Sequence, residues 1–76
     1  EPGNIVIDIR REDEQAASPL VLENIQLIPF YELNGKFKGL DQTKEYLLYC
    51  DKGVMSQLHA QYLKDAGFVN IRVYRP

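Results

Sequence analysis

Four short runs of apolar and β-branched residues predict strands. Each run ends in charged or turn-forming residues, and together they cover residues 4–10 (NIVIDIR), 24–30 (NIQLIPF), 45–50 (EYLLYC) and 70–76 (NIRVYRP). Pro29 closes the second run because proline has no backbone N–H for a strand ladder. The third run is apolar on both faces, which is typical of a central strand in a parallel sheet.

The clearest helical period follows the third run, in the sequence VMSQLHAQYLKDAG. Its apolar positions recur at steps of three and four and predict a buried face of Met55, Leu58, Tyr62 and Ala66, with Leu63 beside them. Gly67 is a suitable C′ residue for this helix. Residues 11–18 predict one helical turn, and residues 31–46 predict a short helix and a connection. The alternation of strands and helices predicts an α/β fold with a four-stranded parallel sheet.

Length and composition indicate one small globular domain. The 76 residues allow a single core, so we expect residues 1–76 to form one domain. Because the chain begins with Glu1 rather than Met, we expect it to be a segment of a longer chain. The apolar runs are far shorter than a membrane span, so no membrane partner is expected.

The net charge and the single cysteine restrict the functions that this chain can have. The net charge is −2 and the lysines are scattered among acids, which argues against a nucleic-acid grip by this segment alone. The single cysteine excludes an internal disulfide and a thiolate metal cluster. One unpaired cysteine fits a reducing compartment, so we expect a cytoplasmic protein. No metal or organic cofactor is expected within these residues.

Cys50 stands where the third strand is predicted to end, directly before a turn and a helix. In open parallel sheets, ligands bind beyond the carboxyl ends of strands, near helix N-termini. Gly53 permits a positive φ, so the turn can aim successive backbone N–H groups at one anion. The helix start adds roughly half a positive charge. We expect the anion-binding loop to comprise Asp51, Lys52, Gly53, Val54, Met55 and Ser56.

Two of these loop residues have expected side-chain roles as well. Ser56 is a candidate helix cap, and Lys52 supplies a cation with a weaker role. Together with the N–H groups, these features favour a thiolate over a thiol and predict a nucleophilic Cys50.

A structural role for Cys50 stays open as the alternative. Free cysteine is among the most buried residue types, and an apolar strand is a common place for it. Position alone favours neither role. An inert core cysteine, however, needs no glycine turn, cation and helix start directly after it, so the reactive role is favoured.

The segment YCDKGVMSQLHAQYLKDAGFVNIRVY resembles the active-site loop, following helix and last strand of rhodanese-like sulfurtransferase domains. VIDIR resembles the Asp-x-Arg strand of the same family, supplied by Asp8 and Arg10. The CDKGVMS loop, the GF pair and the final VYRP are similar to one branch, the C-terminal rhodanese domains of tRNA 4-thiouridine synthetases (the ThiI family). The resemblance covers nearly the whole chain and is most specific in residues 46–76.

This resemblance implies a sulfur-carrying function. Cys50 would take sulfane sulfur from a cysteine desulfurase, hold it as a persulfide and pass it to an activated acceptor. The implied acceptor is an adenylated uridine of tRNA, or a sulfur-carrier protein in thiamine thiazole synthesis. Upstream domains of a parent chain would bind and adenylate the tRNA and supply a second cysteine that resolves the resulting disulfide.

Two departures from the family pattern concern the outer parts of the fold. ASPLVLENIQLIPF, residues 17–30, replaces the usual Gly-His-Ile-Pro-Gly-Ala segment, a replacement that the ThiI branch shares. The usual first strand and helix are missing or lie upstream of Glu1. Neither departure touches the loop at Cys50.

Three alternative functions make different demands on the residues around Cys50. A Cdc25-like phosphatase needs an arginine six positions after its cysteine to hold phosphate oxygens, and Ser56 stands there. A thioredoxin-type oxidoreductase needs a second cysteine where this chain has Gly53. A non-catalytic docking module remains the main alternative, and it predicts a Cys50 that alkylates slowly at pH 6 until the protein unfolds.

Several residues have simpler expected roles. His59 lies more than two helical turns from the helix start, so we expect an exposed or half-buried helix residue rather than a base. Asp8 and Arg10 are expected to form a structural ion pair, with a brace for the catalytic loop as the second option. The acidic run REDE, residues 11–14, predicts a solvated face, with a docking site for a basic sulfur donor as the weaker idea. Packing roles are expected for Phe30, Tyr31, Phe37 and Tyr46.

Overall fold

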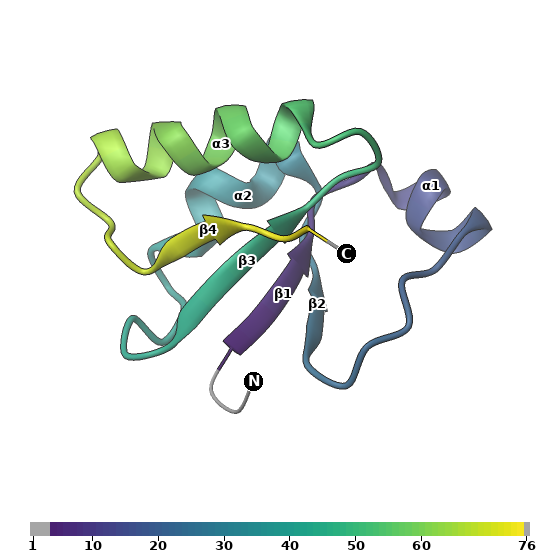
Figure 1. The fold of residues 1–76 in the computed structure, drawn as a ribbon, viewed down its shortest axis with the longest axis horizontal. Coiled ribbons are helices and arrows are strands. Elements are labelled where there is room, and N and C mark those ends of the chain that lie inside the picture. The colour runs from purple at the N-terminus through teal and green to yellow at the C-terminus, as the bar shows by residue number, and fades with distance from the viewer. Residues whose placement is uncertain (1–3, 76) are drawn as a thin grey trace.

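The computed structural model describes residues 4–75 and shows one parallel sheet with three helices (Figure 1). The strands are β1 (Asn4–Asp8), β2 (Ile25–Leu27), β3 (Glu45–Tyr49) and β4 (Ile71–Val73). The helices are α1 (Glu12–Ala17), α2 (Phe30–Phe37) and α3 (Val54–Asp65). The predicted α/β class with four parallel strands is confirmed.

The strand order β2-β1-β3-β4 places β1 and β3 at the centre of the sheet. The central position predicted for the third strand is therefore confirmed. Asp8 is paired with Tyr49 in the register of β1 and β3, so both strands end at the same edge. Cys50 follows β3 at this edge, and the backbone N–H of Ile9 continues the pairing to the Tyr49 carbonyl at 3.0 Å.

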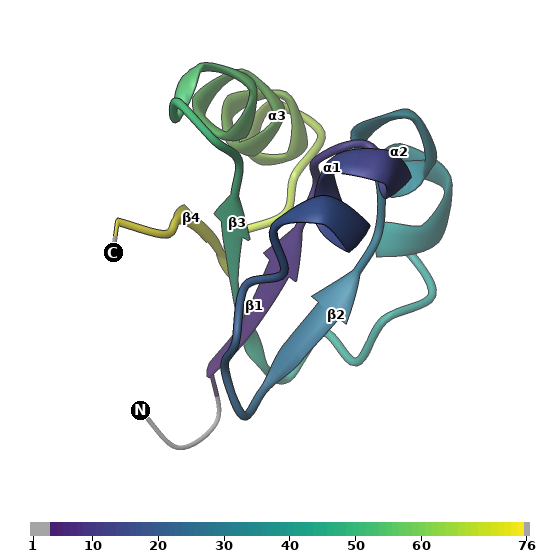
Figure 2. The same ribbon diagram turned by 90° about the vertical axis from the view of Figure 1, so that its right-hand side faces the viewer.

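The hydrophobic core lies between one face of the sheet and the helices α2 and α3 (Figure 2). Its fully buried members include Ile7, Leu33, Phe37, Tyr46, Leu48 and Leu63. The rings of Phe37 and Tyr46 meet edge to face with centroids 5.3 Å apart, which confirms their packing role. Phe30 is half-buried and packs against the core, whereas Tyr31 is exposed.

All four strands are shorter than the apolar runs suggested, the third by Cys50 alone. The first ends at Asp8, because the backbone N–H of Arg10 bonds to the Asp8 carboxylate at 3.1 Å instead of extending the ladder. The second ends at Leu27, and Pro29 forms the N-cap of α2. The last ends at Val73, and position 76 of the predicted strand lies outside the described residues.

The predicted buried face of α3 is confirmed at Leu63, which is 2% exposed, and wrong at Leu58, Tyr62 and Ala66. Leu58 and Tyr62 are 62% and 57% exposed, Ala66 is exposed beyond the helix end, and Met55 is only partly buried. The buried face consists of Ser56, Ala60 and Leu63. Small Ser56 and Ala60 let the helix approach the sheet closely, and the Ser56 hydroxyl keeps a hydrogen-bond partner there.

Candidate active site

Cys50 is half-buried at the carboxyl end of β3 and contacts the first turn of α3. The backbone N–H of Ser56 donates to Cys50 Sγ at 3.2 Å. The thiol in turn contacts Ser56 Oγ at 3.4 Å, and that hydroxyl donates to the Gly53 carbonyl at 3.1 Å. Sγ therefore has a backbone N–H donor on one side and the Ser56 hydroxyl on the other.

The predicted anion-binding loop, Asp51 to Ser56, overlaps α3 because the helix begins at Val54. Its last three residues therefore form the first turn of the helix. Gly53 has φ +79°, which is the left-handed conformation that its lack of Cβ permits. Gly53 also occupies the N-cap position, so the expected cap at Ser56 is wrong: Ser56 is the third residue of the helix. Its N–H is one of the free amides of a helix start, and it is directed at Cys50.

A cleft of about 430 Å³ opens above Cys50. Its lining comes from the end of β1, from α1, from α2 and from the start of α3. The lining residues are Ile9, Arg10, Arg11, Glu14, Phe30, Cys50, Asp51, Lys52, Val54 and Met55. Asp51 and Lys52 are exposed, so they form the outer rim of the cleft.

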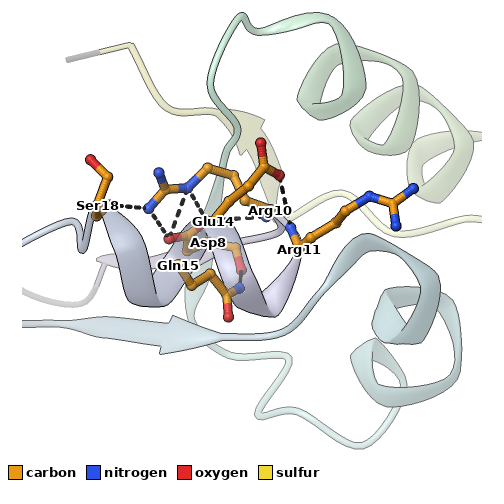
Figure 3. Close-up of polar contacts among 6 residues, drawn as sticks. All are labelled: Asp8, Arg10, Arg11, Glu14, Gln15 and Ser18. Atoms are coloured by element: carbon orange, nitrogen blue, oxygen red, sulfur yellow. Dashed lines mark hydrogen bonds and ion pairs between the residues drawn. The ribbon is translucent and has the colours of Figure 1, made fainter.

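Asp8 and Arg10 form a buried ion pair at the neighbouring strand end (Figure 3). Arg10 Nε and Nη2 reach the two carboxylate oxygens of Asp8 at 3.0 and 2.8 Å, and Nη2 also donates to the Ser18 carbonyl at 2.7 Å. The hydrogen bonds that the Arg10 guanidinium donates to the Asp8 carboxylate raise the pKa of Arg10 above its ordinary value. Gln15 Nε2 donates to the Asp8 carbonyl at 2.8 Å. The predicted structural ion pair is confirmed.

This ion pair supports the wall of the cleft rather than the Cys50 turn. Ser18 and Gln15 belong to α1 and its end, so the pair fixes α1 against β1. The Arg10 guanidinium also stacks 5.2 Å from the centre of the Tyr49 ring, next to Cys50 in the chain. Among residues 4–75, no hydrogen bond links Asp8 or Arg10 to residues 50–56.

The sequence profile of the rhodanese-like domain family matches residues 1–75. The chain belongs to this family. It is 64% identical over 77 aligned residues to the tRNA sulfurtransferase of Pseudomonas putida, an alignment that covers 99% of this chain. The same alignment covers only 16% of that relative, so the chain spans about a sixth of its length.

Solved structures of rhodanese proteins show the same fold. A rhodanese-related protein from Thermoplasma volcanium is 30% identical, with a TM-score of 0.77 over 93% of this chain and 69% of that one. A NAD-dependent persulfide reductase from A. fulgidus is 25% identical, with a TM-score of 0.76 over 96% of this chain and 13% of that one. The expected rhodanese fold is therefore confirmed.

Besides Ile9, sequence reasoning missed three residues that line the cleft of this rhodanese-like domain. Arg11 places its guanidinium 5.7 Å from the centre of the Phe30 ring. The backbone N–H of Arg11 donates to Glu14 Oε1 at 3.2 Å (Figure 3). Glu14 and Phe30 line the cleft with it. All three lie just beyond the carboxyl ends of β1 and β2, the same edge as Cys50. That common edge is the signal that could have identified them.

The acidic run at residues 11–14 has the solvated character that was predicted. Its acidic residues lie in the exposed first turn of α1. Glu12 Oε1 accepts a hydrogen bond from the Tyr31 hydroxyl at 2.8 Å, which raises the pKa of Tyr31. A docking role for this run stays a prediction.

His59 lies outside the lining of the cleft and is half-buried, as predicted. Its ring is 6.0 Å from that of Phe30. Nδ1 is buried and has no hydrogen-bond partner among the described residues, and burial lowers the pKa of His59. This environment suits packing between α3 and α2.

Two other kinds of feature are absent from residues 4–75. No three His, Cys, Asp or Glu side chains in this part of the chain are placed to hold a metal ion. No helix there is long and apolar enough to span a membrane.

Proposed function

We propose that this rhodanese-like domain carries sulfane sulfur on Cys50 for the thiolation of tRNA. One observation carries the proposal: Cys50 Sγ lies in an open cleft and accepts the backbone N–H of Ser56 at a helix start. The similar protein of Pseudomonas putida named tRNA sulfurtransferase supports the reaction class. The solved persulfide reductase of like fold supports persulfide chemistry.

Loading would proceed by exchange between sulfur atoms. The Cys50 thiolate attacks the outer sulfur of a persulfide (R–S–SH) on a cysteine desulfurase. A new S–S bond forms at Cys50, the S–S bond of the donor breaks, and the donor cysteine leaves as a thiolate. Atoms and electrons balance without an oxidant. The Ser56 N–H, which contacts Sγ in the free domain, lies close enough to stabilise charge that remains on the sulfur pair.

Delivery would use the same persulfide as a nucleophile. Its outer sulfur attacks the activated carbon of an adenylated uridine, and AMP leaves. A thiol elsewhere in the parent protein then attacks Cys50 Sγ, which releases the 4-thiouridine and leaves a disulfide that an external thiol reduces. This chain has one cysteine, so the second thiol belongs to another part of the parent protein. We assign tRNA binding and adenylation to other domains of that protein as well. A sulfur-carrier protein in thiamine synthesis is the second acceptor, and a reducing cytoplasm suits both.

The residues from Asp51 to Ser56 would bind the negative charge of the persulfide on Cys50. Within residues 4–75, Ser56 supplies the one backbone N–H that donates to Cys50 Sγ. Asp51 and Lys52 form the outer rim, and the first turn of α3 supplies free amides. We expect one additional sulfur atom to extend from Sγ into the cleft.

The test is intact-mass analysis after incubation with a cysteine desulfurase and free cysteine. We expect wild type to gain the mass of one sulfur atom, which dithiothreitol removes, and Cys50→Ala to gain none. Cys50→Ser serves as the matched control because it keeps the size of the side chain and the contacts with Ser56. Equal masses before and after incubation in the wild type, with a desulfurase that is active on its own, would contradict the carrier role.

The docking-module alternative is tested by alkylation. If Cys50 is the cleft-facing nucleophile, iodoacetamide should label it at pH 6 faster in the folded protein than in urea. Slower labelling in the folded protein would support a packing role for Cys50 instead.

A further inference from the structure

The solvent side of α3 carries an unexpected apolar stripe. Val54, Leu58 and Tyr62 are 68%, 62% and 57% exposed. They recur every four residues, and each step of four advances about 40° around a helix, so the three side chains form one continuous band. We call Val54, Leu58 and Tyr62 the α3 stripe.

The α3 stripe lies opposite the side of the helix that packs on the sheet. Leu63 and Ala60 face the core from the other side and are 2% and 4% exposed. The helix therefore has two apolar faces: Leu63 lies on the inner one, and Leu58 and Tyr62 lie on the outer one. An amphipathic helix normally turns its larger apolar residues inward, so the outer face indicates a contact with another molecule.

The α3 stripe begins at the mouth of the cleft that holds Cys50. Val54 is both the first residue of the stripe and part of the cleft lining. Met55, the next residue, also lines the cleft and packs against the core. A molecule that covers Leu58 and Tyr62 is therefore held beside the opening through which Cys50 is reached.

The size of the α3 stripe indicates what kind of molecule binds there. A stable dimer buries about 1,200–2,000 Å² in total, far more than three side chains provide. Weak and short-lived complexes use smaller contacts. A sulfur donor has to dock, transfer one atom and leave, so a small apolar contact beside the cleft matches its requirements better than those of a permanent partner.

We infer that the α3 stripe is the docking surface for the sulfur-donor protein, which carries its persulfide on a segment that enters the cleft past Val54. This inference depends on the proposed function of Cys50. The partner surface that fits is an apolar patch next to a mobile persulfide-bearing cysteine. Transfer follows the balanced exchange described above, and the stripe contributes only to the encounter.

The experiment compares two sulfur donors on the same variants. One donor is a cysteine desulfurase with free cysteine, and the other is glutathione persulfide, which is too small to cover the stripe. The variant is Leu58→Gln combined with Tyr62→Gln, because glutamine keeps the helix propensity and adds no charge. The matched control is Val69→Gln, since Val69 is 92% exposed and lies beyond the far end of α3.

We expect the double variant to gain sulfur from the desulfurase roughly tenfold more slowly than wild type at low donor concentration. Its gain from glutathione persulfide should stay within about twofold, and Val69→Gln should match wild type with both donors. The substituted side chains are exposed, so circular dichroism should show an unchanged fold.

Each other result would overturn the inference. Equal desulfurase rates in wild type and the double variant would remove the docking role, and equal slowing with both donors would assign the effect to the cleft itself. A wild-type dimer in sedimentation that the double variant abolishes would assign the stripe to a second copy of the chain. If wild type gains no sulfur from either donor, the proposed function of Cys50 fails, which this design distinguishes from a failure of the stripe alone.

Discussion

Two neighbouring strands end at the same edge of the sheet in opposite ways. β1 ends in the Asp8–Arg10 ion pair, whose groups are buried and held by charge-assisted hydrogen bonds of 2.7–3.0 Å to Asp8 and Ser18. β3 ends in Cys50, which is half-buried and has one amide donor at 3.2 Å and one hydroxyl contact at 3.4 Å. The charged groups at the β1 end are paired within the fold, whereas the Sγ atom of Cys50 at the β3 end stays accessible from the cleft.

The comparison shows how a small domain combines stability with reactivity. The polar groups of the Asp8–Arg10 pair satisfy one another and the end of α1, so this pair fixes one wall of the cleft. The Cys50 turn depends on backbone geometry instead: a left-handed Gly53 and the first amides of α3. We therefore expect substitutions at the β1 end to change stability and substitutions at the β3 end to change chemistry.

The largest effect is expected at Asp8. Asp8→Asn removes the negative charge and leaves the Arg10 guanidinium buried without a counter-ion, which should lower the free energy of unfolding by about 3–5 kcal/mol in urea titrations. Replacing both residues together, as Asp8→Leu with Arg10→Met, should cost less than Asp8→Asn alone because no buried charge remains.

The exposed ion pair between Glu32 and Lys36 is the control for this prediction. Its N–O distance of 2.7 Å matches the 2.8 Å of the buried pair, but both side chains are solvated. Glu32→Gln should cost less than about 1 kcal/mol. A similarly small loss for Asp8→Asn would show that burial adds nothing to the β1 pair and would remove the contrast between the strand ends.

An intermediate effect is expected at Gly53. Gly53→Ala places a Cβ on a residue with φ +79°, although no atom lies within 4 Å of that position, so the cost is conformational strain of about 1–2 kcal/mol. The turn should also relax and move the Ser56 N–H away from Cys50 Sγ. We expect sulfur loading of Cys50, measured by intact mass, to slow roughly tenfold.

Gly67→Ala separates strain from chemistry. Gly67 has φ +106° at the end of α3, and it too has open space around the added Cβ. Gly67→Ala should therefore lose comparable stability in urea titrations while loading Cys50 at the wild-type rate. Equal slowing in both variants would mean that global destabilisation, rather than the geometry of the Cys50 turn, sets the rate.

Local patterns were enough to predict the elements that carry Cys50. The apolar run before it, the positive φ at Gly53 and the end of α3 just before Gly67 all follow from preferences within a few residues. The outward α3 stripe could not be predicted this way. Periodicity locates an apolar face on a helix, but it cannot tell whether the sheet or another molecule covers that face.

The walls of the cleft depend on contacts between distant segments. Arg11 and Phe30 belong to different elements and meet only because β1 and β2 pair in register. The interior position of Ser56 was also hidden, since a serine in a helix usually faces water. Its hydroxyl is satisfied by the Gly53 carbonyl and by the Cys50 thiol, which makes burial acceptable. The catalytic role of Cys50 and the anion-binding role of its turn remain predictions.

The smallest effect concerns pH and lies away from both strand ends. Burial lowers the pKa of His59 from its ordinary value of 6.5, so the unfolded state binds a proton more readily than the folded state. Stability from this group is therefore present above about pH 6.5 and is lost as the pH falls through the folded-state pKa. Arg10 stays protonated over this pH range because its pKa is raised above its ordinary value. His59→Leu also removes the unpartnered Nδ1, so the variant should be slightly more stable at pH 7.

The measurement is the difference between the unfolding free energies of wild type and His59→Leu from pH 7.5 to pH 5. Because the chain has one histidine, the carboxylates contribute equally to both proteins and cancel in the difference. Wild type should lose stability relative to the variant by less than about 1 kcal/mol over this range, since His59 is only half-buried. A constant difference would show that His59 is hydrated in the folded state, and α3 would then pack on α2 less closely than the ring contact with Phe30 indicates.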